Sequence, residues 1–176
     1  GGVAKTTTAI TLAAALADTG HAVLVIDLDA QACATFSLGI DPEDLPPRTV
    51  DFLLDDLPSG EGAAQMRSAI RTTDEGFSLL PATLSLASAD VSLADRPARE
   101  RILSRILDEI RDTFDVIVID CSPSLGLTTI NALVAADDVL VPFKCETLSH
   151  RGLGQLMESI DEVKRWSNPD LRVAGI

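Results

Sequence analysis

Gly1-Gly2-Val3-Ala4-Lys5-Thr6-Thr7 opens the chain and leads directly into an Ala- and Leu-rich helical pattern over residues 7–18. Glycines let backbone N–H groups close around phosphate oxygens, and the amino end of a helix adds a partial positive charge. In loops of this kind a lysine reaches the β- and γ-phosphates, and the hydroxyl group after it can bind Mg²⁺. The stretch therefore predicts a phosphate-binding loop between a strand and a helix, with Lys5 and Thr6 as its main functional groups.

The loop departs from the standard pattern G-x-x-x-x-G-K-[ST], because Ala4 stands in place of the last glycine. The first position of the pattern would precede Gly1. We expect the small methyl group of Ala4 to be compatible with the loop. The alternative is a glycine-rich end before a threonine-capped helix, without a phosphate site.

Two aspartates follow the first apolar strand pattern, which covers residues 22–26. Asp27 and Asp29 would emerge at the carboxyl end of this strand, where open α/β sheets bind their ligands. Residues i and i+2 of an extended chain point to the same side. We therefore expect one carboxylate to lie near a metal ion and the other to orient a water molecule. The alternative is a pair of solvated acids at the end of a strand.

A second apolar run, Val116-Ile-Val-Ile119, ends in Asp120 and continues as Cys121-Ser-Pro123. Four apolar residues followed by an aspartate have the form of a Walker B strand, in which the acid holds Mg²⁺ through its water shell. The proline that follows predicts a rigid loop beside the phosphates. Such a run is common by itself, but after a phosphate loop it is a specific signal.

Strand and helix patterns alternate along the chain and predict an α/β fold. We expect a doubly wound, mostly parallel sheet with helices on both faces, formed by residues 1–176 as one domain. A strand should precede a phosphate loop, so the chain is expected to lack the first strand and the C-terminal part of a longer protein. Strand patterns cover residues 22–26, about 77–80, 115–119, 138–142 and 172–176; helical patterns cover 7–18, 97–112, 125–135 and 149–166; the rest of 39–95 reads as loops and short helices.

The charge of the chain is strongly negative: 14 Lys and Arg residues oppose 27 Asp and Glu residues, for a formal net charge of −13. This balance argues against nucleic-acid binding by the whole surface. The densest cationic group, Arg96, Arg99, Arg101 and Arg105, is offset by neighbouring acids. The acidity and the scarcity of lysine favour an organism with a high-salt cytoplasm, where charges are almost fully screened. An ordinary acidic domain is the alternative.

Cysteine spacing and hydropathy indicate the compartment. Cys33, Cys121 and Cys145 form no C-x-x-C pair, which argues against a disulfide scaffold and a zinc site. No apolar run is long enough to cross a bilayer. We expect a protein of the reducing cytoplasm without membrane insertion, in which Cys121 and Trp166 serve as packing residues.

Together these motifs resemble those of the ParA/Soj partition ATPases, within the larger group that also holds MinD and the nitrogenase iron protein. The resemblance covers essentially the whole chain and implies a P-loop NTPase fold. Its most specific part is Ser-Pro-Ser-Leu-Gly-Leu at 122–127, followed by Asn131-Ala-Leu. The matching stretches are Lys5-Thr-Thr-Thr-Ala-Ile, Asp27-Leu-Asp-Ala-Gln31, Leu79-Leu-Pro-Ala82, Ile119-Asp-Cys-Ser-Pro-Ser-Leu-Gly-Leu-Thr-Thr-Ile-Asn-Ala-Leu133 and Val141-Pro-Phe-Lys-Cys-Glu146.

The resemblance implies ATP and Mg²⁺ as cofactors and assigns roles to the matching residues. Lys5 would be the catalytic lysine of the phosphate loop, and Asp29 would be the catalytic acid that positions the attacking water. Mg²⁺ would be held by Thr6, Asp27 and Asp120. The nucleotide phosphates would be lined by Gly1, Gly2, Val3, Ala4, Lys5, Thr6 and Thr7. The signature lysine of the family should directly precede Gly1, outside this chain.

The resemblance further implies a switch protein that hydrolyses ATP to ADP and phosphate and segregates a plasmid or a chromosome. As an ATP-dependent homodimer it would bind double-stranded DNA without sequence preference, in association with the nucleoid. A ParB-like centromere-binding protein would stimulate hydrolysis. The adenine- and DNA-contacting residues are expected beyond residue 176. Two alternatives remain, a MinD-like membrane-cycling ATPase that positions division sites and a non-catalytic adaptor of the same fold.

Overall fold

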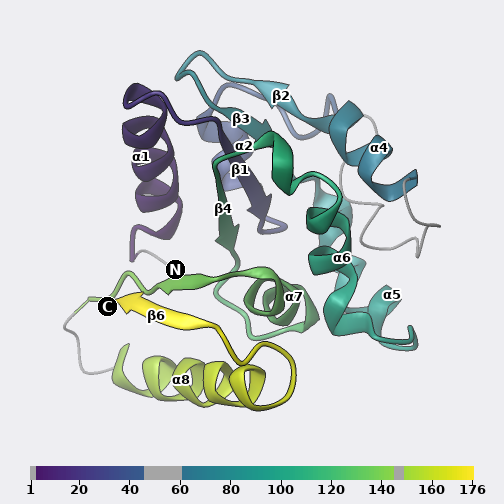
Figure 1. Cartoon of the computed structure of the whole chain (residues 1–176), viewed down its shortest axis with the longest axis vertical. Helices are drawn as coiled ribbons and strands as arrows, with labels where there is room; N and C mark the ends of the chain where they lie inside the picture. Colours follow the sequence, from purple (N-terminus) through teal and green to yellow (C-terminus); the bar gives the residue numbers. More distant parts are fainter. Residues whose placement is uncertain (1–2, 46–60, 145–148) are drawn as a thin grey trace.

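The computed structural model describes residues 3–45, 61–144 and 149–176, and Figure 1 shows the course of the chain. The helices are α1 (Lys5–Asp18), α2 (Cys33–Ser37), α4 (Glu61–Ala69), α5 (Ala89–Leu93), α6 (Ile102–Asp108), α7 (Leu127–Ala135) and α8 (Ser149–Trp166). The strands are β1 (Val23–Leu28), β2 (Arg71–Thr72), β3 (Ser78–Leu80), β4 (Val116–Cys121), β5 (Asp138–Leu140) and β6 (Arg172–Gly175). Short 3₁₀ turns are η1 (Leu84–Ser88), η2 (Arg99–Arg101) and η3 (Arg111–Thr113).

Most strands of the described ranges belong to one sheet with the order β2-β3-β1-β4. β1 pairs in parallel with both β3 and β4, and the short β2 runs antiparallel to β3. β5 and β6 form a separate parallel pair. Helix α1 lies on one face of the larger sheet and α6 lies on the opposite face (Figure 1). The predicted α/β architecture, a mostly parallel sheet with helices on both faces, is therefore confirmed.

The side chains of β1 build a core on each face of the larger sheet. Val23 and Val25 pack toward α1 together with Phe77. Leu24 and Ile26 pack on the opposite side, in the core that includes residues of α4, α5 and α6. Successive residues of a strand point to opposite faces, so an uninterrupted apolar run is what a strand covered on both sides requires.

Helix α1 ends at Asp18, as predicted, but begins at Lys5, two residues before the predicted start. Its Ala-rich segment has high helix propensity. At its carboxyl end Gly20 has a φ of 92°, and its N–H donates to the carbonyl of Ala17 at 2.8 Å. Glycine adopts this left-handed conformation without strain, which confirms Gly20 as the predicted helix stop.

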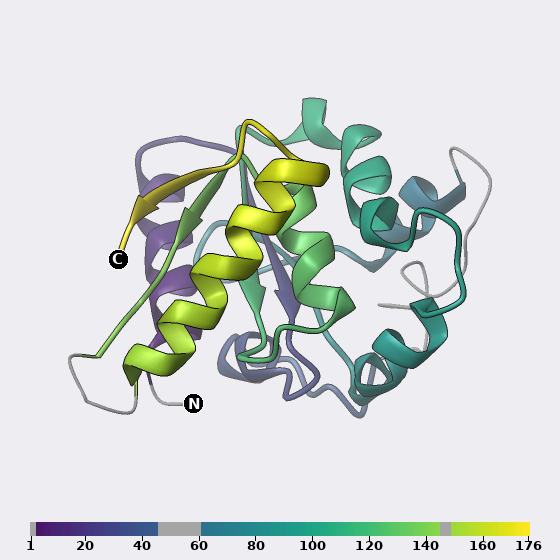
Figure 2. The same ribbon diagram turned by 90° about the horizontal axis from the view of Figure 1, so that it is seen from below.

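A third core joins α7, α8, β5 and β6, with α8 lying against α7 (Figure 2). Its most buried side chain in α8 is Ile160. Asn168 closes the carboxyl end of α7, because its amide donates to the carbonyls of Leu133, Val134 and Ala136 at 3.1, 3.2 and 2.7 Å. These donors satisfy carbonyl groups that a helix end leaves without partners.

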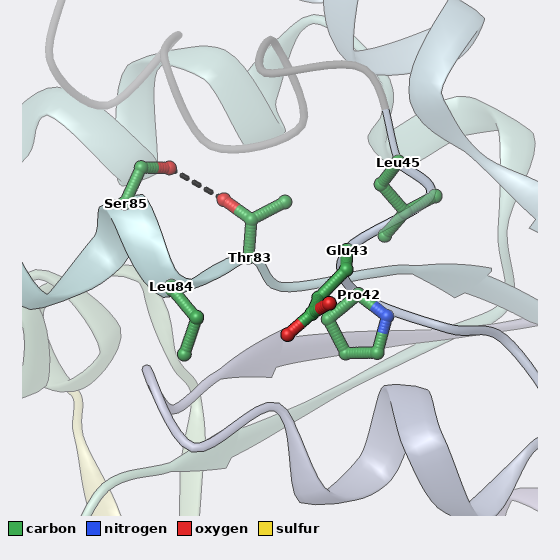
Figure 3. A pocket seen from close by; sticks show the side chains of 6 residues that line it. All are labelled: Pro42, Glu43, Leu45, Thr83, Leu84 and Ser85. Carbon is green, nitrogen blue, oxygen red and sulfur yellow. Dashed lines mark hydrogen bonds between the residues drawn. The ribbon is translucent and has the colours of Figure 1, made fainter.

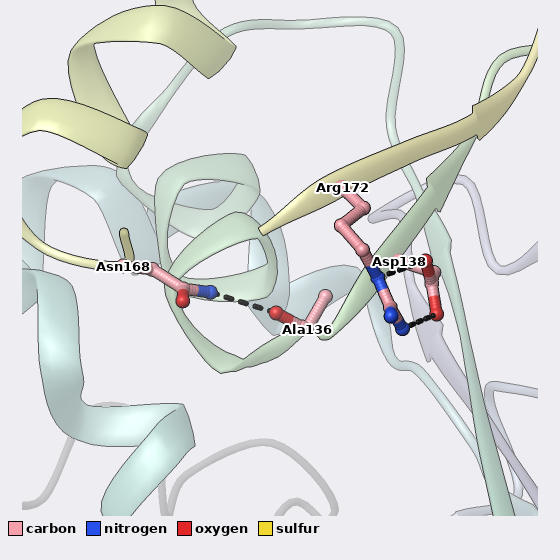
Figure 4. A network of polar contacts seen from close by, with 4 residues as sticks. All are labelled: Ala136, Asp138, Asn168 and Arg172. Atoms are coloured by element: carbon pink, nitrogen blue, oxygen red, sulfur yellow. Dashed lines mark hydrogen bonds and ion pairs between the residues drawn. The ribbon is translucent and has the colours of Figure 1, made fainter. Parts of the chain in front are cut away.

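An ion pair also links the two strands of the separate pair, β5 and β6. Arg172 of β6 forms two hydrogen bonds with the carboxylate of Asp138 on β5, at 3.0 and 2.8 Å (Figure 4).

Among the described helices, none combines the length and the apolar character that crossing a membrane requires.

The prediction of one continuous helix over residues 97–112 is wrong, but the prediction of its buried apolar face is confirmed. The segment is divided into η2, α6 and η3. Ala98 has a left-handed φ of 49°, and the backbone of Arg101, at φ −111° and ψ 5°, also leaves the α-helical region. The buried apolar side chains are nevertheless those of the predicted stripe, Ile102, Leu103, Ile106, Leu107 and Ile110.

The prediction that Trp166 is a packing anchor is wrong, because its side chain is 76% exposed. Helix α8 buries Ile160 and Val163. Trp166 lies roughly 120° around the helix from Ile160, on a surface that the core does not cover.

Candidate functional site

The predicted phosphate loop leads into the amino end of α1. Val3 and Ala4 precede the helix and Lys5 is its first residue, whereas Gly1 and Gly2 lie outside the described residues. Ala4 adopts a left-handed conformation, with φ 61° and ψ 28°. Glycine adopts this conformation without strain, which is a physical reason for the glycine of the standard pattern at this position.

Asp120, in β4, lies close to the first turn of α1. Its side chain is 3% exposed. Burial raises the pKa of its carboxyl group, while a hydrogen bond from the Thr6 hydroxyl and the nearby Lys5 ammonium oppose that rise. Within the described part of the chain, Oδ2 of Asp120 is buried and has no hydrogen-bond partner. Thr7 lies in the same helical turn but is exposed.

These groups have the chemistry of a Mg²⁺ site. Mg²⁺ prefers oxygen ligands and is usually held by one or two carboxylates together with phosphates and water. The buried Oδ2 of Asp120 and the hydroxyl of Thr6 are oxygen ligands of this kind. Over the described ranges no group of three or more His, Cys, Asp and Glu side chains could hold a metal ion. A cation at Asp120 would therefore need phosphate or water ligands as well.

Asp27 and Asp120 lie beside each other, because they are register partners on β1 and β4. Both strands extend further than predicted and so include the acids. By alternation the two acids belong to the same face of the sheet as Val25 and Val118, which pack toward α1. The register thus brings the two predicted metal-binding acids to the face where the phosphate loop enters α1.

The carboxylates of Asp27 and Asp29 have different surroundings, although their spacing predicted that both point to the same side of an extended chain. Asp27 is 2% exposed; its Oδ2 accepts the N–H and hydroxyl of Thr35 at 2.9 and 2.8 Å, and its Oδ1 accepts the N–H of Asp29 at 3.2 Å. Asp29 is half-buried, and its Oδ1 accepts the N–H of Gln31 at 3.0 Å. The spacing argument assumed an extended chain through Asp29, but β1 ends at Leu28.

Thr35 is the residue of this region that sequence reasoning missed. It lies in α2 and is fully buried. Burial raises the pKa of Asp27, and the two hydrogen bonds from Thr35 partly oppose that rise. Helix α2 has five residues, too few for a helical period to be recognised, so the sequence offered no signal for it.

Cys121 follows Asp120 and packs against the main core, as predicted. Desolvation raises the pKa of its thiol to about 12. The thiol is therefore neutral at physiological pH, which makes it unreactive as a nucleophile or a metal ligand.

A shallow hollow of about 370 Å³ lies beside the loop after β3 (Figure 3). Its lining residues are Pro42, Glu43, Leu45, Thr83, Leu84 and Ser85. The hydroxyl groups of Thr83 and Ser85 are hydrogen-bonded to each other, and the charged residue of the lining is the acidic Glu43. This lining does not suit a phosphate group.

Comparisons with known proteins agree with this geometry. The sequence profile of a family described as "AAA domain" matches residues 1–173. The chain is 42% identical to the sporulation initiation inhibitor protein Soj of Bacillus subtilis, over 100% of this chain and 67% of that protein. It is also 42% identical to the chromosome partitioning protein ParA of Myxococcus xanthus, over 100% of this chain and 60% of that protein.

A solved structure, cobyrinic acid a,c-diamide synthase from Mycobacterium smegmatis with bound ATP analog and magnesium, matches with a TM-score of 0.89 and 48% identity. The match covers 98% of this chain and 68% of that one. The chain thus spans between 60% and 68% of the length of these relatives. The extent of the profile match and the identity to Soj and ParA over the whole chain show that it belongs to the family of ParA/Soj-type P-loop ATPases.

Proposed function

We propose that the chain binds ATP with Mg²⁺ and hydrolyses it, as part of a partition ATPase that segregates a plasmid or a chromosome. The observation that carries this proposal is the buried Oδ2 of Asp120, without a partner among the described residues, beside Thr6 and Lys5. The amino end of α1 and the lysine attract phosphate, and the buried carboxylate attracts a cation. The names of Soj and ParA and the ATP analog bound by the M. smegmatis protein support it.

In the proposed mechanism, residues 1–7 line the phosphates, and Lys5 contacts the β- and γ-phosphates. Thr6 and Asp120 would hold Mg²⁺, whose chemistry would be to neutralise charge on the phosphates. Asp27 supports this site from the neighbouring position of β1. Asp29 orients a water molecule toward the γ-phosphate, since positioning and charge stabilisation dominate such reactions.

The proposed ATPase works as an ATP-dependent homodimer that binds double-stranded DNA in the nucleoid and responds to a ParB-like partner. With a net charge of −13, DNA contacts must come from a local basic group. Arg99 and Arg101 do not form that group here, because neighbouring acidic residues such as Asp95 and Glu100 offset their positive charge. We therefore expect DNA binding from the full-length dimer and not from residues 1–176. Gel shifts with random duplex in ATP, ADP and no nucleotide test this expectation, and binding by the segment alone would contradict it.

Phosphate release by the full-length protein tests the nucleotide site. Wild type should release phosphate only with Mg²⁺, and Lys5→Ala should lose ATP binding and release because the phosphates lose their cation. Lys164→Ala, in the last turn of α8, is the matched control and should behave as wild type. Equal rates of release by wild type and Lys5→Ala would contradict the phosphate-loop assignment, whereas no release by wild type would leave a non-catalytic adaptor as the better description.

Asp29→Ala separates water positioning from nucleotide binding. The variant should bind a fluorescent ATP analogue like wild type, while its hydrolysis rate falls about 100-fold or more, as is typical when a group that handles the attacking water is removed. Loss of ATP binding would show that Asp29 holds the nucleotide.

The name of the M. smegmatis protein suggests a different overall activity, the synthesis of a cobyrinic acid diamide. A synthase should turn over nucleotide only when its acid substrate is present. The proposed ATPase should turn over ATP with water alone, and DNA with a ParB-like protein should accelerate it. Turnover that depends on cobyrinic acid would contradict the proposal.

A further inference from the structure

Thr35 joins three segments through one side chain. Its hydroxyl group donates to Oδ2 of Asp27 at 2.8 Å and accepts the N–H of Ala82 at 2.9 Å. Its own N–H donates to the same Oδ2 at 2.9 Å. The end of β1, helix α2 and the loop after β3 therefore meet at a residue with 0% exposure.

Asp27 connects the hydrogen bonds of Thr35 to the backbone of Asp29. Its second oxygen, Oδ1, accepts the N–H of Asp29 at 3.2 Å. The carbonyl of Asp29 accepts the N–H of Ala32 at 2.8 Å, in the turn that leads into α2. The N–H of Asp29 is thus bound by the carboxylate of Asp27, and its carbonyl is bound by an N–H at the start of α2. Thr35 contacts that carboxylate and is itself part of α2, so it constrains both contacts.

Removing the Thr35 hydroxyl would loosen this arrangement in two ways. Oδ2 of Asp27 would keep one of its two donors, and the N–H of Ala82 would lose its acceptor. The carboxylate of Asp27 could then rotate and release the N–H of Asp29. Displacements of about 1 Å at a reacting group can lower a rate by roughly 100-fold without removing any contact to the substrate.

We propose that Thr35 is a positioning residue for the hydrolysis step, which acts through Asp27 to set the backbone, and so the carboxylate, of Asp29. The inference rests on the proposed ATP hydrolysis and adds to it a residue that touches neither nucleotide nor metal. It makes Asp27 the link between the buried hydroxyl and the acid that orients water.

Full-length Thr35→Val tests this role, because valine keeps the branched shape and removes the hydroxyl. We expect its kcat to fall about 10- to 100-fold, the usual effect of losing a supporting hydrogen bond behind an active group, while its Kd for ATP stays within about twofold of wild type. Thr35→Ser keeps the hydroxyl and should retain kcat within about threefold of wild type. In an Asp29→Ala background, Thr35→Val should produce no further loss.

Thr73→Val is the matched control for stability. Thr73 is also a buried threonine, and its hydroxyl donates to the carbonyl of Phe77 at 2.8 Å in the turn between β2 and β3. This variant should also lose thermal stability, although less than Thr35→Val because one hydrogen bond is lost in place of two, and it should keep the kcat of wild type. If Thr35→Val does not fold, Thr35→Ser and Thr35→Ala give the same comparison, since they too differ only by the hydroxyl.

Several outcomes would overturn the inference. These are a kcat for Thr35→Val equal to that of wild type or of Thr73→Val, a Kd for ATP that rises as much as kcat falls, and a serine variant as impaired as the valine one. Failure of the proposed function looks different: wild type would release no phosphate, or Asp29→Ala would hydrolyse ATP as fast as wild type.

Discussion

Asp27 of β1 and Asp120 of β4 occupy partner positions in the parallel register, so that two carboxyl groups lie side by side in the interior. They are 2% and 3% exposed. Burial raises the pKa of each, and the charge of Asp120 adds to the rise at Asp27. Without a bound cation this pair opposes folding, as is typical of residues kept for function.

We predict that Asp120→Asn stabilises the metal-free protein at neutral pH. A carboxyl group whose pKa is raised by folding keeps its proton longer in the native than in the unfolded state. Stability therefore falls as pH rises from the ordinary value of 3.8 to the raised native value and stays lower above it. An asparagine at this position has no carboxyl group to ionise and so avoids this loss of stability. Each kcal/mol gained in the free energy of unfolding should raise the Tm by roughly 2–4 °C in a domain of this size.

Thermal melts in EDTA across pH check this prediction, and the advantage of the variant should disappear as pH falls below 3.8. Asp161→Asn, at an exposed position of α8, is the control and should show no comparable gain. Mg²⁺ with ATP should stabilise wild type more than Asp120→Asn. A variant that melts below wild type in EDTA would contradict the argument.

Gly126 should not tolerate a side chain, because a Cβ atom there would lie 1.8 Å from Oδ2 of Asp90. Asp90 closes the amino end of α7, since its Oδ1 accepts the N–H and hydroxyl of Thr128 at 2.9 and 2.6 Å. Gly126→Ala should displace Asp90 and destabilise the protein by about 1–3 kcal/mol, the loss of a helix cap plus strain.

Urea denaturation of a double-mutant cycle checks this cause. Asp90→Ala alone should cost about 1 kcal/mol, and adding Gly126→Ala to it should cost little more, because the clash is gone. Gly154→Ala, at a helical position of α8 with open space around its Cβ, should instead be neutral or stabilising. Additive losses in the cycle would refute the contact as the cause.

Asn131, in the stretch that resembles the partition ATPases most specifically, should contribute strongly to the stability of the fold. It is fully buried; its amide donates to the carbonyls of Arg99 and Leu127 at 2.8 and 2.9 Å, and its Oδ1 accepts the N–H of Leu103 at 3.1 Å. Asn131→Ala should lower the free energy of unfolding by about 2–4 kcal/mol, because buried groups lose their partners. The half-buried Asn168, replaced by alanine, should cost less, since water can take its place. Similar losses for both would contradict this reasoning.

Ala4→Gly should leave stability unchanged or raise it by up to about 1 kcal/mol, because glycine relieves the left-handed backbone there. Ala32 has a similar φ of 49°, but its methyl group is buried, with 1% exposure. Ala32→Gly should therefore gain nothing, since about 0.8 kcal/mol of apolar burial is lost. Chemical denaturation of the two variants distinguishes them, and a large loss for Ala4→Gly would contradict the prediction.

Stability should rise with KCl into the molar range, because the net charge of −13 makes the acidic surface repel itself. At about 1 M salt the Debye length is roughly 3 Å, so this repulsion is nearly removed. Melts over a KCl series check it. A Tm that stays flat or falls would reject the high-salt interpretation of the composition.

Much of the fold and part of the site could be predicted from the sequence, because they depend on neighbours a few residues apart. Apolar runs ending in Asp27 and Asp120 indicated buried strands with acids at their carboxyl ends. Gly20 marked the end of α1, and α8 was predicted with the bounds that the structure shows. Period and propensity act within one element, so they are visible in one segment of sequence.

Only the tertiary structure decided how these elements constrain one another. The Thr35 hydroxyl meets the N–H of Ala82 47 positions away, Asn131 meets Leu103 28 positions away, and Asp90 meets Thr128 38 positions away. No sequence period encodes such contacts, because they depend on where the chain returns after a sheet has formed. For the same reason, the sequence pattern of residues 97–112 predicted the buried face correctly but not the breaks in the helix. Asp27 could likewise be expected at the site, while its hydrogen bond with Thr35 could not.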